Sequence, residues 1–549
     1  MKKTLALVLA LVLMIGMLAG CKSGSETQES NPVGTGQTDP NQGTGDKTET
    51  GASGGKTDSV VISVAADPVT LFPWGSANEG RNVTRMITYE TLCFKDQDMN
   101  IVNCLAKEIT EVDEKTFDIE LYDYIYDTAG NQMTASDICF SLDLCIEDGN
   151  NASSVAPLES YEAISDYVVR LTFSDATAGC LDQITTQIYM VTEAGWEQSG
   201  DGMQLNPIGT SPYKLTDYVT GSYYEYTRTG NYWQKDESLV CVRSMDNVEK
   251  VTYRIITDKS TAAIALENGE IDSALTLKSE DFGNFVDTEN GYTARSGYNS
   301  KLVAAMAITH LTFNCSDNSP CADENLRKAI ASCIDTETIA YAVSGGLGRA
   351  PMAFALESMT DYDPVVEEGP YYNYEESNEQ ALAYLEASSY SGQTLKMLVN
   401  PEVDSKIAPL VQAYCDAIGI KIELLTYESA LYNSYHQTDD AAMYDIDLAL
   451  PPSGSYMWGK CGELDVDNYT NGLNHCFIND AELNEIYAAA KYLPYDISET
   501  SALIDYIDEH VFMYGIYVPK NLVVASDKFE TIVTNHTNWI VPGACTYTR

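Results

Sequence analysis

The chain has 549 residues, 44% of them hydrophobic, and its 81 acidic and 32 basic side chains give a formal net charge of −49. A chain of this length exceeds what one hydrophobic core supports, so we expect two or more domains. So acidic a chain would repel nucleic acid, and we expect no nucleic-acid partner. The acidity is typical of a soluble secreted protein, or of a cleft that selects cationic or zwitterionic ligands.

The first 20 residues have the features of a lipoprotein signal peptide. A basic start at residues 1–3 precedes an apolar stretch over residues 4–17, which is too short for an ordinary membrane span. Leu18-Ala19-Gly20-Cys21 resembles the bacterial lipobox, which implies cleavage before Cys21 and its acylation. A signal peptide cleaved elsewhere is the alternative. Residues 21–58 are rich in Gly, Ser, Thr and Gln, so we expect a flexible tether.

Folded sequence begins at Ser59. Residues 60–64 form a short apolar run that predicts a buried strand, and the apolar spacing over residues 80–92 predicts a helix. Alternation over residues 116–121 predicts another strand. Residues 134–141 are predicted to start a helix, capped by Thr134 or Ser136.

A β-hairpin is predicted over residues 206–233. Pro207, Gly209 and Pro212 punctuate a tight loop, which is followed by alternating residues 213–219. Thr220-Gly221 suits a two-residue turn, and the return strand at 223–228 is aromatic and β-favouring.

The second half alternates strands with helices, which favours a mostly parallel sheet with helices on its faces. Asp323 and Asp335 are predicted N-caps of two successive helices, the second of which ends at Gly345-Gly346. Further strands are predicted at 251–256, 394–399, 420–424 and 444–448, and helices at 260–268, 379–385 and 407–418.

These stretches together resemble one family. The hairpin is similar to the Gly-Thr-Gly-Pro-Tyr hairpin, ending in Asn-Pro-Asp-Tyr-Trp, of the family-five extracellular solute-binding proteins, which are receptors of bacterial ABC importers for oligopeptides, dipeptides and nickel. Ser211 replaces the second Gly, and Thr229-Gly230-Asn231 replaces Asn-Pro-Asp. Tyr89-Glu90-Thr91-Leu92 and Gly269-Glu270-Ile271-Asp272 match further family motifs in the family's order.

The resemblance implies an α/β fold of the two-lobe type II periplasmic-binding-protein class, with an extra small subdomain. Two strands should cross between the lobes, near residues 311–314 and 516–518. The implied segments are 1–20 signal peptide, 21–58 lipidated tether, 59–104 first segment of lobe I, 105–205 extra subdomain, 206–309 second segment of lobe I, 310–515 lobe II and 516–549 C-terminal segment of lobe I.

We therefore expect a lipid-anchored receptor on the outer face of the bacterial cytoplasmic membrane, the periplasmic face in a Gram-negative cell. It would be a monomer that captures a peptide or another small polar solute and delivers it to the membrane subunits of an ABC permease. An extracellular hydrolase of glycans or peptides is one alternative, and a sensor or adhesion lipoprotein on the same fold is another.

The sequence offers little support for an enzyme. None of the five histidines lies in HExxH or another dense cluster, and no GxSxG motif occurs. Gly345-Gly346-Leu347-Gly348 lacks the spacing of a dinucleotide site. We expect no catalytic residue, no metal site and no cofactor.

Ligand contacts are predicted where loops follow strands at the crevice of a two-lobe receptor. For each aromatic side chain among them, packing in the core is the alternative. The predicted ligand-binding residues are Trp74, Asn78, Asn314, Arg349, Tyr456 and Trp458.

The ligand class depends on residues 450–454. Peptide receptors of the family resemble one another here in a Gly-Trp-x-x-Asp segment, whose Asp binds the α-ammonium group of the peptide. The Trp position is Pro451 and the Asp position is Gly454, so the carboxylate is missing unless Glu463 or Asp465 substitutes. Peptide remains the first candidate, and a saccharide stacked on Tyr456 and Trp458 is the next.

The chain has 14 cysteines. If Cys21 carries lipid, 13 remain, so at least one of them is unpaired or pairs between chains. The pairs Cys315/Cys321 and Cys461/Cys476 are close enough in sequence to be bridged. We expect the others to be mostly small buried hydrophobes.

Overall fold

The computed structural model describes residues 55–304, 307–367, 372, 374–400, 406–437, 440–450, 456–468, 474–492 and 496–548. The signal peptide, Cys21, most of the tether, Pro451 and Gly454 lie outside the described residues. From Ser53 onward the chain forms one compact unit. None of the helices described is long and apolar enough to cross a membrane.

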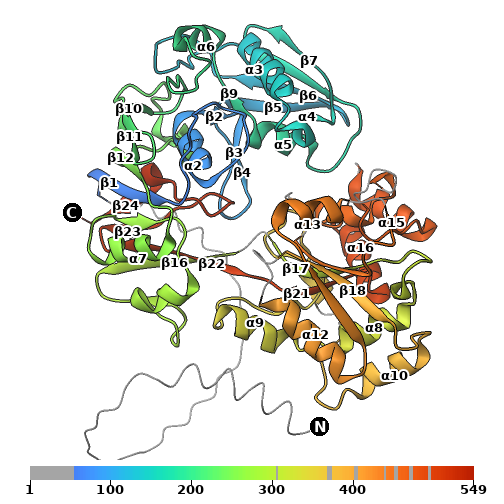
Figure 1. Cartoon of the computed structure of the whole chain (residues 1–549). Helices are drawn as coiled ribbons and strands as arrows, with labels where there is room; N and C mark the ends of the chain where they lie inside the picture. Colours follow the sequence, from blue (N-terminus) through green and yellow to red (C-terminus); the bar gives the residue numbers. More distant parts are fainter. Residues whose placement is uncertain are drawn as a thin grey trace, which may run out of the picture. The chain divides into compact units, whose positions relative to one another are not determined.

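A seven-stranded sheet carries the first predicted strand at its centre (Figure 1). β1 runs parallel to β12 and β13, whereas the hairpin β10–β11 and the pairs β13–β22 and β16–β22 are antiparallel. The strand order is β10 (Tyr213–Val219), β11 (Tyr223–Arg228), β12 (Val248–Ile255), β1 (Thr57–Val64), β13 (Ser273–Ala274), β22 (Lys520–Ser526) and β16 (Tyr298–Ala304).

A four-stranded antiparallel sheet lies within the segment predicted as an extra subdomain. Helix α3 (Ala135–Asp148) packs against it, and Thr134 forms the predicted N-terminal cap as a capping box with Asp137. The strand order is β5 (Ala106–Asp113), β6 (Thr116–Leu121), β8 (Val168–Phe173) and β7 (Leu158–Ser165). The boundaries of the subdomain stay a prediction.

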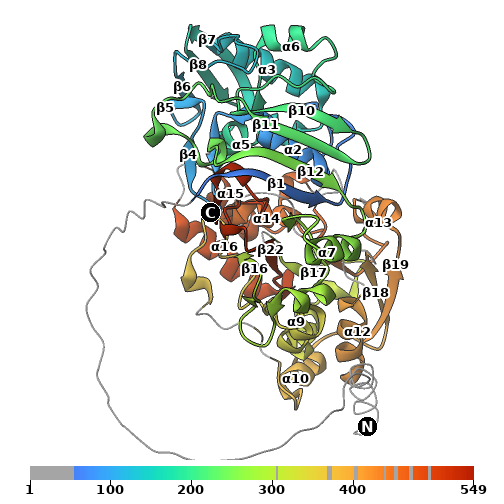
Figure 2. The same cartoon turned by 90° about the vertical axis from the view of Figure 1, so that its left-hand side faces the viewer.

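A five-stranded sheet organises the second half, and it is mixed instead of mostly parallel. β18 is parallel to β19 and β20, but β17 is antiparallel to both β20 and β21. α8 (Glu324–Cys333), α9 (Thr336–Ser344) and α12 (Ile407–Ala417) share its core. In Figure 2, α9 and α12 lie below β17 and β18. The strand order is β19 (Lys421–Thr426), β18 (Thr394–Val399), β20 (Ile446–Ala449), β17 (Thr309–Phe313) and β21 (Met513–Tyr517).

The chain passes twice between the seven-stranded and the five-stranded sheets. It leaves β16 for β17, and it returns from β21 to β22 through a two-residue link. Both passages lie near the predicted crossing strands, while the division into lobes stays a prediction.

The remaining helices and strands are α2 (Glu79–Thr88), β2 (Glu90–Thr91), β3 (Cys93–Lys95), β4 (Ile101–Asn103), α4 (Ala152–Val155), α5 (Cys180–Gln187), β9 (Tyr189–Met190), α6 (Glu193–Ser199), α7 (Lys259–Glu267), β14 (Val286–Asp287), β15 (Thr293–Ala294), α10 (Glu379–Ala387), α13 (Ser429–His436), α14 (Met457–Lys460), α15 (Ala481–Lys491), α16 (Ile497–His510), β23 (Phe529–Thr531) and β24 (Thr546–Tyr547).

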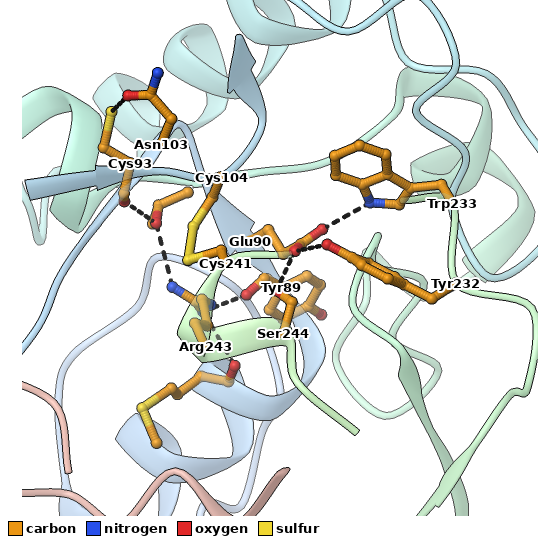
Figure 3. Close-up of a disulfide and its surroundings, with 12 residues drawn as sticks. Tyr89, Glu90, Cys93, Asn103, Cys104, Tyr232, Trp233, Cys241, Arg243 and Ser244 are labelled. Carbon is orange, nitrogen blue, oxygen red and sulfur yellow. Dashed lines mark hydrogen bonds between the residues drawn. A yellow bond between two sulfur atoms is a disulfide. The ribbon is translucent and has the colours of Figure 1, made fainter. Parts of the chain in front are cut away.

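Glu90 explains why the first helix stops before residue 92, where the apolar spacing placed its end. The carboxylate is fully buried and accepts hydrogen bonds from Tyr232 Oη at 2.7 Å and Trp233 Nε1 at 3.0 Å, as well as from the Ser244 hydroxyl (Figure 3). These contacts hold residues 90–91 as strand β2, paired with β9. The Tyr-Trp that ends the hairpin motif therefore satisfies the Glu of the Tyr-Glu-x-Leu motif.

The cysteines pair differently from the sequence-based expectation. A disulfide joins Cys104 to Cys241, which are 137 residues apart in the chain (Figure 3). Cys315, Cys321, Cys461 and Cys476 are free thiols, so neither proposed local bridge forms. Sequence proximity was a poor guide because a disulfide needs the two β-carbons to approach in the fold. The expectation of mostly buried free thiols is confirmed within the described residues.

Candidate ligand-binding cleft

A cavity of about 760 Å³ gathers segments that are far apart in the sequence. We call it the cleft. Its walls come from the loop after β1, helix α2, the turn that carries Arg243 and the loop at residues 535–539. Ala307 and Pro519 line it as well, so the cleft lies beside both passages of the chain between the two larger sheets. That position suits a ligand site more than that of another cavity, of about 800 Å³, which is lined by Tyr124 and residues 126–130, 210–211, 229 and 231–236.

Trp74 and Asn78 follow β1, but only Trp74 lines the cleft. The Trp74 side chain is 1% exposed, and its Nε1 donates to the Tyr189 carbonyl at 3.0 Å. Asn78 is the N-cap of α2, where its Oδ1 accepts from the Arg81 amide at 2.8 Å. Asn78 thus caps α2 and thereby helps to hold this wall of the cleft in place, which is a structural role.

Arg85 projects from α2 into the same wall. Its Nε donates to the Phe72 carbonyl at 2.8 Å and its Nη2 to the Ser76 carbonyl at 3.4 Å. Burial lowers the pKa of the guanidinium, but arginine remains protonated in proteins. Its positive charge therefore reaches the cleft already held in place by neutral oxygens.

Arg243 is positioned by the disulfide, because it lies two residues after Cys241 on the turn Val242–Ser244 (Figure 3). Its Nη2 donates to the carbonyls of Met86 and Tyr89, and its Nη1 donates to the Thr91 hydroxyl at 3.2 Å. Arg243 Nε is buried without a hydrogen-bond partner among the described residues. The guanidinium also lies over the Tyr189 ring, 5.1 Å from its centroid.

Lys460 and His536 complete the basic lining. Burial lowers the pKa of Lys460 to about 8, so it remains mostly protonated at neutral pH. Burial also lowers the pKa of His536 to about 4, which leaves that imidazole neutral. Its Nδ1 lies 3.2 Å from the Lys95 carbonyl.

The charge of the cleft is opposite to that of the whole chain. The described residues that line it include Arg85, Arg243 and Lys460 but no aspartate and no glutamate. In a chain with 81 acidic side chains, this absence is a local feature that net charge could not reveal. Cationic groups in a low-dielectric hollow attract an anion, so the geometry favours a ligand with a carboxylate or another anionic group over a purely cationic one.

Tyr456 and Trp458 contact the protein itself. Their partners lie at the start of α5 and on the loop before it. Tyr456 Oη donates to Asp182 Oδ2 at 3.2 Å, and Trp458 Nε1 donates to the Ala178 carbonyl at 3.2 Å. Gly179 lies between the two partners, Ala178 and Asp182, in the sequence. Its φ is +83°, and a β-carbon there would come within 2.4 Å of the Tyr456 ring. Neither aromatic side chain is among the residues that line the cleft.

The remaining predicted contacts also lie off the cleft lining. Asn314 is fully buried, and its Nδ2 donates to the carbonyls of Ala441 at 2.6 Å and Tyr444 at 2.8 Å, which favours a structural role. The backbone of Arg349 pairs with that of Val518, with both N–O distances at 2.9 Å. Direct contact of these residues with a ligand stays a prediction.

The two acids considered as substitutes for the missing carboxylate are engaged elsewhere. Glu463 is 1% exposed and hydrogen-bonded to Thr312, and Asp465 forms an ion pair with Lys491 at 2.8 Å. Neither lines the cleft. Within the described residues, the cleft therefore offers no acidic partner for an ammonium group.

The sequence interpretation missed Arg85, Arg243, Lys460 and His536. Arg85 left a detectable signal, since it lies one helical turn before Tyr89 and therefore shares the buried face of α2. Arg243 left none, because its place depends on a disulfide whose partner is 137 residues away.

Known proteins share both sequence and fold with this chain. A family model for bacterial extracellular solute-binding proteins, family 5 (middle), matches residues 100–463. The oligopeptide-binding protein AppA of Bacillus subtilis (strain 168) is 23% identical over 518 residues, which cover 89% of this chain and 88% of AppA. The glutathione-binding protein GsiB of Escherichia coli (strain K12) is 23% identical over 226 residues, 40% of this chain and 43% of GsiB.

The crystal structure of AppA from Clostridium difficile has the same fold, with a TM-score of 0.75 at 17% identity. The match covers 90% of this chain and 100% of the Clostridium difficile chain. The matched model spans well over half of the sequence, and the family motifs satisfy one another around Glu90. The chain belongs to the bacterial extracellular solute-binding proteins of family 5.

Proposed function

We propose that this chain is the lipid-anchored receptor of an ABC importer, which captures a peptide or a similar small solute in the cleft and delivers it to a membrane permease. Family membership supports the solute-binding role. The lipobox-like Leu18-Ala19-Gly20-Cys21 supports anchorage through Cys21. Relatives named for oligopeptides and for glutathione support peptides as the first ligand class.

The observation that carries the ligand class is that the described lining of the cleft is cationic and contains no acidic residue. A peptide bound there is recognised mainly through its carboxylate, by Arg243, Arg85 and Lys460. An ammonium group buried without an acidic partner costs several kcal/mol, so the α-ammonium end lies toward solvent or is absent from the ligand.

Tyr456 and Trp458 then act in closure instead of contacting the ligand. Their hydrogen bonds to Asp182 and the Ala178 carbonyl join elements of the second half to the segment around α5. Hinge closure around a ligand would form such contacts, and release to the permease would break them.

Thermal-shift measurements with trialanine, its N-acetylated form and its C-terminal amide test the ligand class. The free and N-acetylated peptides should both stabilise the chain, and the amide should not. At about 1,000 times the dissociation constant, the free energy of unfolding rises by roughly 4 kcal/mol, which is a shift of a few degrees for a protein of this size. An equal shift with the amide would contradict carboxylate recognition, and a shift that N-acetylation abolishes would contradict a solvent-facing ammonium. A response to neutral oligosaccharides alone would contradict the peptide class.

Arg243→Gln supplies the matching variant, and Arg254→Gln is its control. Arg254 is an exposed arginine that pairs with Glu270 at 3.2 Å, away from the cleft. Arg243→Gln should lose the response to trialanine while Arg254→Gln retains it, once calorimetry shows both variants folded. Loss of labelled-peptide uptake in cells without this chain would distinguish transport from a sensor or adhesion role.

A further inference from the structure

Three of the five histidines gather around one buried glutamate in the second half of the chain. His310 lies on β17, His436 ends α13, and His475 lies in the loop before α15. Glu463, on the turn Gly462–Leu464, is 1% exposed and lies among them. The sequence predicted no metal site, because these four residues are spread over more than 150 positions; the fold brings them together.

His436, Glu463 and His475 lie close enough together to hold a metal ion. One ligand atom from each lies within 4.8 Å of the others, and the two imidazole rings have centroids 3.7 Å apart. His475 Nδ1 is 3.6 Å from Glu463 Oε1, which is too long for a hydrogen bond. Two ligands at 2.0–2.1 Å from a tetrahedral Zn²⁺ lie about 3.3 Å apart, so ligand atoms that lie within 4.8 Å of one another would have to approach by at most about 1.5 Å to seat the ion.

The inner atoms of this cluster are buried and unsatisfied. Neither ring nitrogen of His475 has a hydrogen-bond partner among the described residues, and neither has Glu463 Oε1. His475 is 5% exposed. Buried polar atoms are normally paired, so an imidazole nitrogen and a carboxylate oxygen that lie 3.6 Å apart without hydrogen-bond partners indicate a missing partner that accepts lone pairs.

Other polar atoms of His436 and Glu463 already have hydrogen-bond partners. His436 Nδ1 lies 2.6 Å from Asp447 Oδ2, which leaves Nε2 as the free ligand atom. Tyr432 Oη donates to the other Asp447 oxygen at 3.1 Å. Glu463 Oε2 accepts from Thr312 Oγ1 at 2.5 Å, so Oε1 is the oxygen left over. Carboxylate–histidine–metal arrangements orient their ligands in this way.

We propose that His436, Glu463 and His475 bind a divalent transition-metal ion, with Zn²⁺ as the fitting ion, in a site separate from the cleft. Two imidazoles and one carboxylate suit Zn²⁺, and a fourth position remains for water. None of the three residues lines the cleft. The ion would fasten the end of α13, the Gly462–Leu464 turn and the loop before α15 to the five-stranded sheet.

The first test uses the folded chain, stripped of metal with a chelator and dialysed, with ZnCl₂ or CoCl₂ as the only addition. Calorimetry should show about one equivalent of Zn²⁺ per chain. Zn²⁺ should raise the melting temperature, and Co²⁺ should give the intense visible bands of a four-coordinate site. A folded wild-type chain that takes up neither ion overturns the proposal.

Variants locate the site. His475→Asn removes a ligand and should abolish the Co²⁺ bands, whereas His510→Asn, which alters a histidine paired with Glu324 on α8, should leave them unchanged. Asp447→Asn changes only the orienting carboxylate and should weaken Zn²⁺ binding about 10–100-fold. Bands that survive His475→Asn, or that disappear with His510→Asn, overturn the assignment. Should His475→Asn fail to fold, the wild-type measurements decide alone. Peptide binding plays no part in these readouts, so failure here leaves the proposed function untouched.

Discussion

Arg85 and Arg243 are held by neutral oxygens, and this determines what they can do for a ligand. Their hydrogen bonds go to backbone carbonyls and to the Thr91 hydroxyl, so each guanidinium is fixed in place while its charge remains uncompensated by these partners. A buried charge without a counter-ion is unfavourable, and an anionic ligand would relieve that cost. Because the donors are fixed before binding, little side-chain entropy is lost when the ligand arrives.

Lys460 makes ligand binding depend on pH. Its pKa is lowered to about 8 by burial, so raising the pH from 7 to 9 removes the charge in the free protein. A bound carboxylate favours the protonated amine, so affinity should fall above pH 8, by at most about tenfold per pH unit. Stability without ligand should change in the opposite direction. The unfolded chain, with an ordinary lysine pKa, binds more protons between about pH 8 and 10.4, so the free energy of unfolding rises there.

Titration calorimetry with trialanine at pH 7, 8 and 9 checks the first expectation, and Lys460→Met provides its comparison. The pH dependence should be lost in the variant, whose side chain fills the same buried space without a charge. An unchanged wild-type affinity across this range would show that Lys460 does not face the ligand.

At the scale of elements, the hairpin β10–β11 secures the end of α2. Ser211, the residue that departs from the family motif, donates its hydroxyl to the Ile87 carbonyl at 2.5 Å, which satisfies one of the last acceptors of the helix. Gly209 approaches the same helix end so closely that a β-carbon would lie 2.0 Å from the Thr88 carbonyl oxygen. The motif therefore combines a close contact with a helix cap, and both sustain the wall that carries Arg85.

Gly209→Ala should lower the free energy of unfolding by about 1–3 kcal/mol or more, because the clash is with backbone and cannot be relieved by a rotamer change. Gly283→Ala is the matched control, since a β-carbon there meets no atom within 4 Å. The control should stay within about 0.5 kcal/mol of wild type. Urea denaturation of the three proteins checks this, and equal stabilities for both variants would contradict the close approach.

Local signals predicted the elements well, and long-range contacts limited the prediction of the site. Asp323 and Asp335 cap α8 and α9 as expected, since an N-cap depends only on a residue and its next three neighbours. The prediction of a mostly parallel sheet in the second half was wrong, because β17 and β21, which are about 200 residues apart in the chain, add antiparallel pairs at one edge. Cleft residues such as Arg243 need contacts that no local pattern encodes.

The whole molecule combines an acidic chain with a cleft free of acidic residues in its described lining. The net charge of the chain therefore does not describe the charge at the cleft. Under the proposed function, selectivity would depend on a few buried cations, and the acidity would serve general solubility. Under the proposed function, the receptor works beside the membrane permease. Its attachment to the membrane then depends on its N-terminal segment.

Cys21→Ala tests that position. If the lipobox-like segment directs acylation, the wild-type chain should fractionate with membranes and the variant should appear in the soluble extracellular or periplasmic fraction. Each methylene of a buried acyl chain contributes about 0.8 kcal/mol, so loss of the lipid removes most of the membrane affinity. Cys139→Ala is the control, because Cys139 is a half-buried free thiol on α3 and gives no reason for a change in location. Immunoblots of the separated fractions measure both. Membrane retention of Cys21→Ala equal to that of wild type would show that some other feature holds the chain at the membrane, and the anchoring role of Cys21 would be wrong.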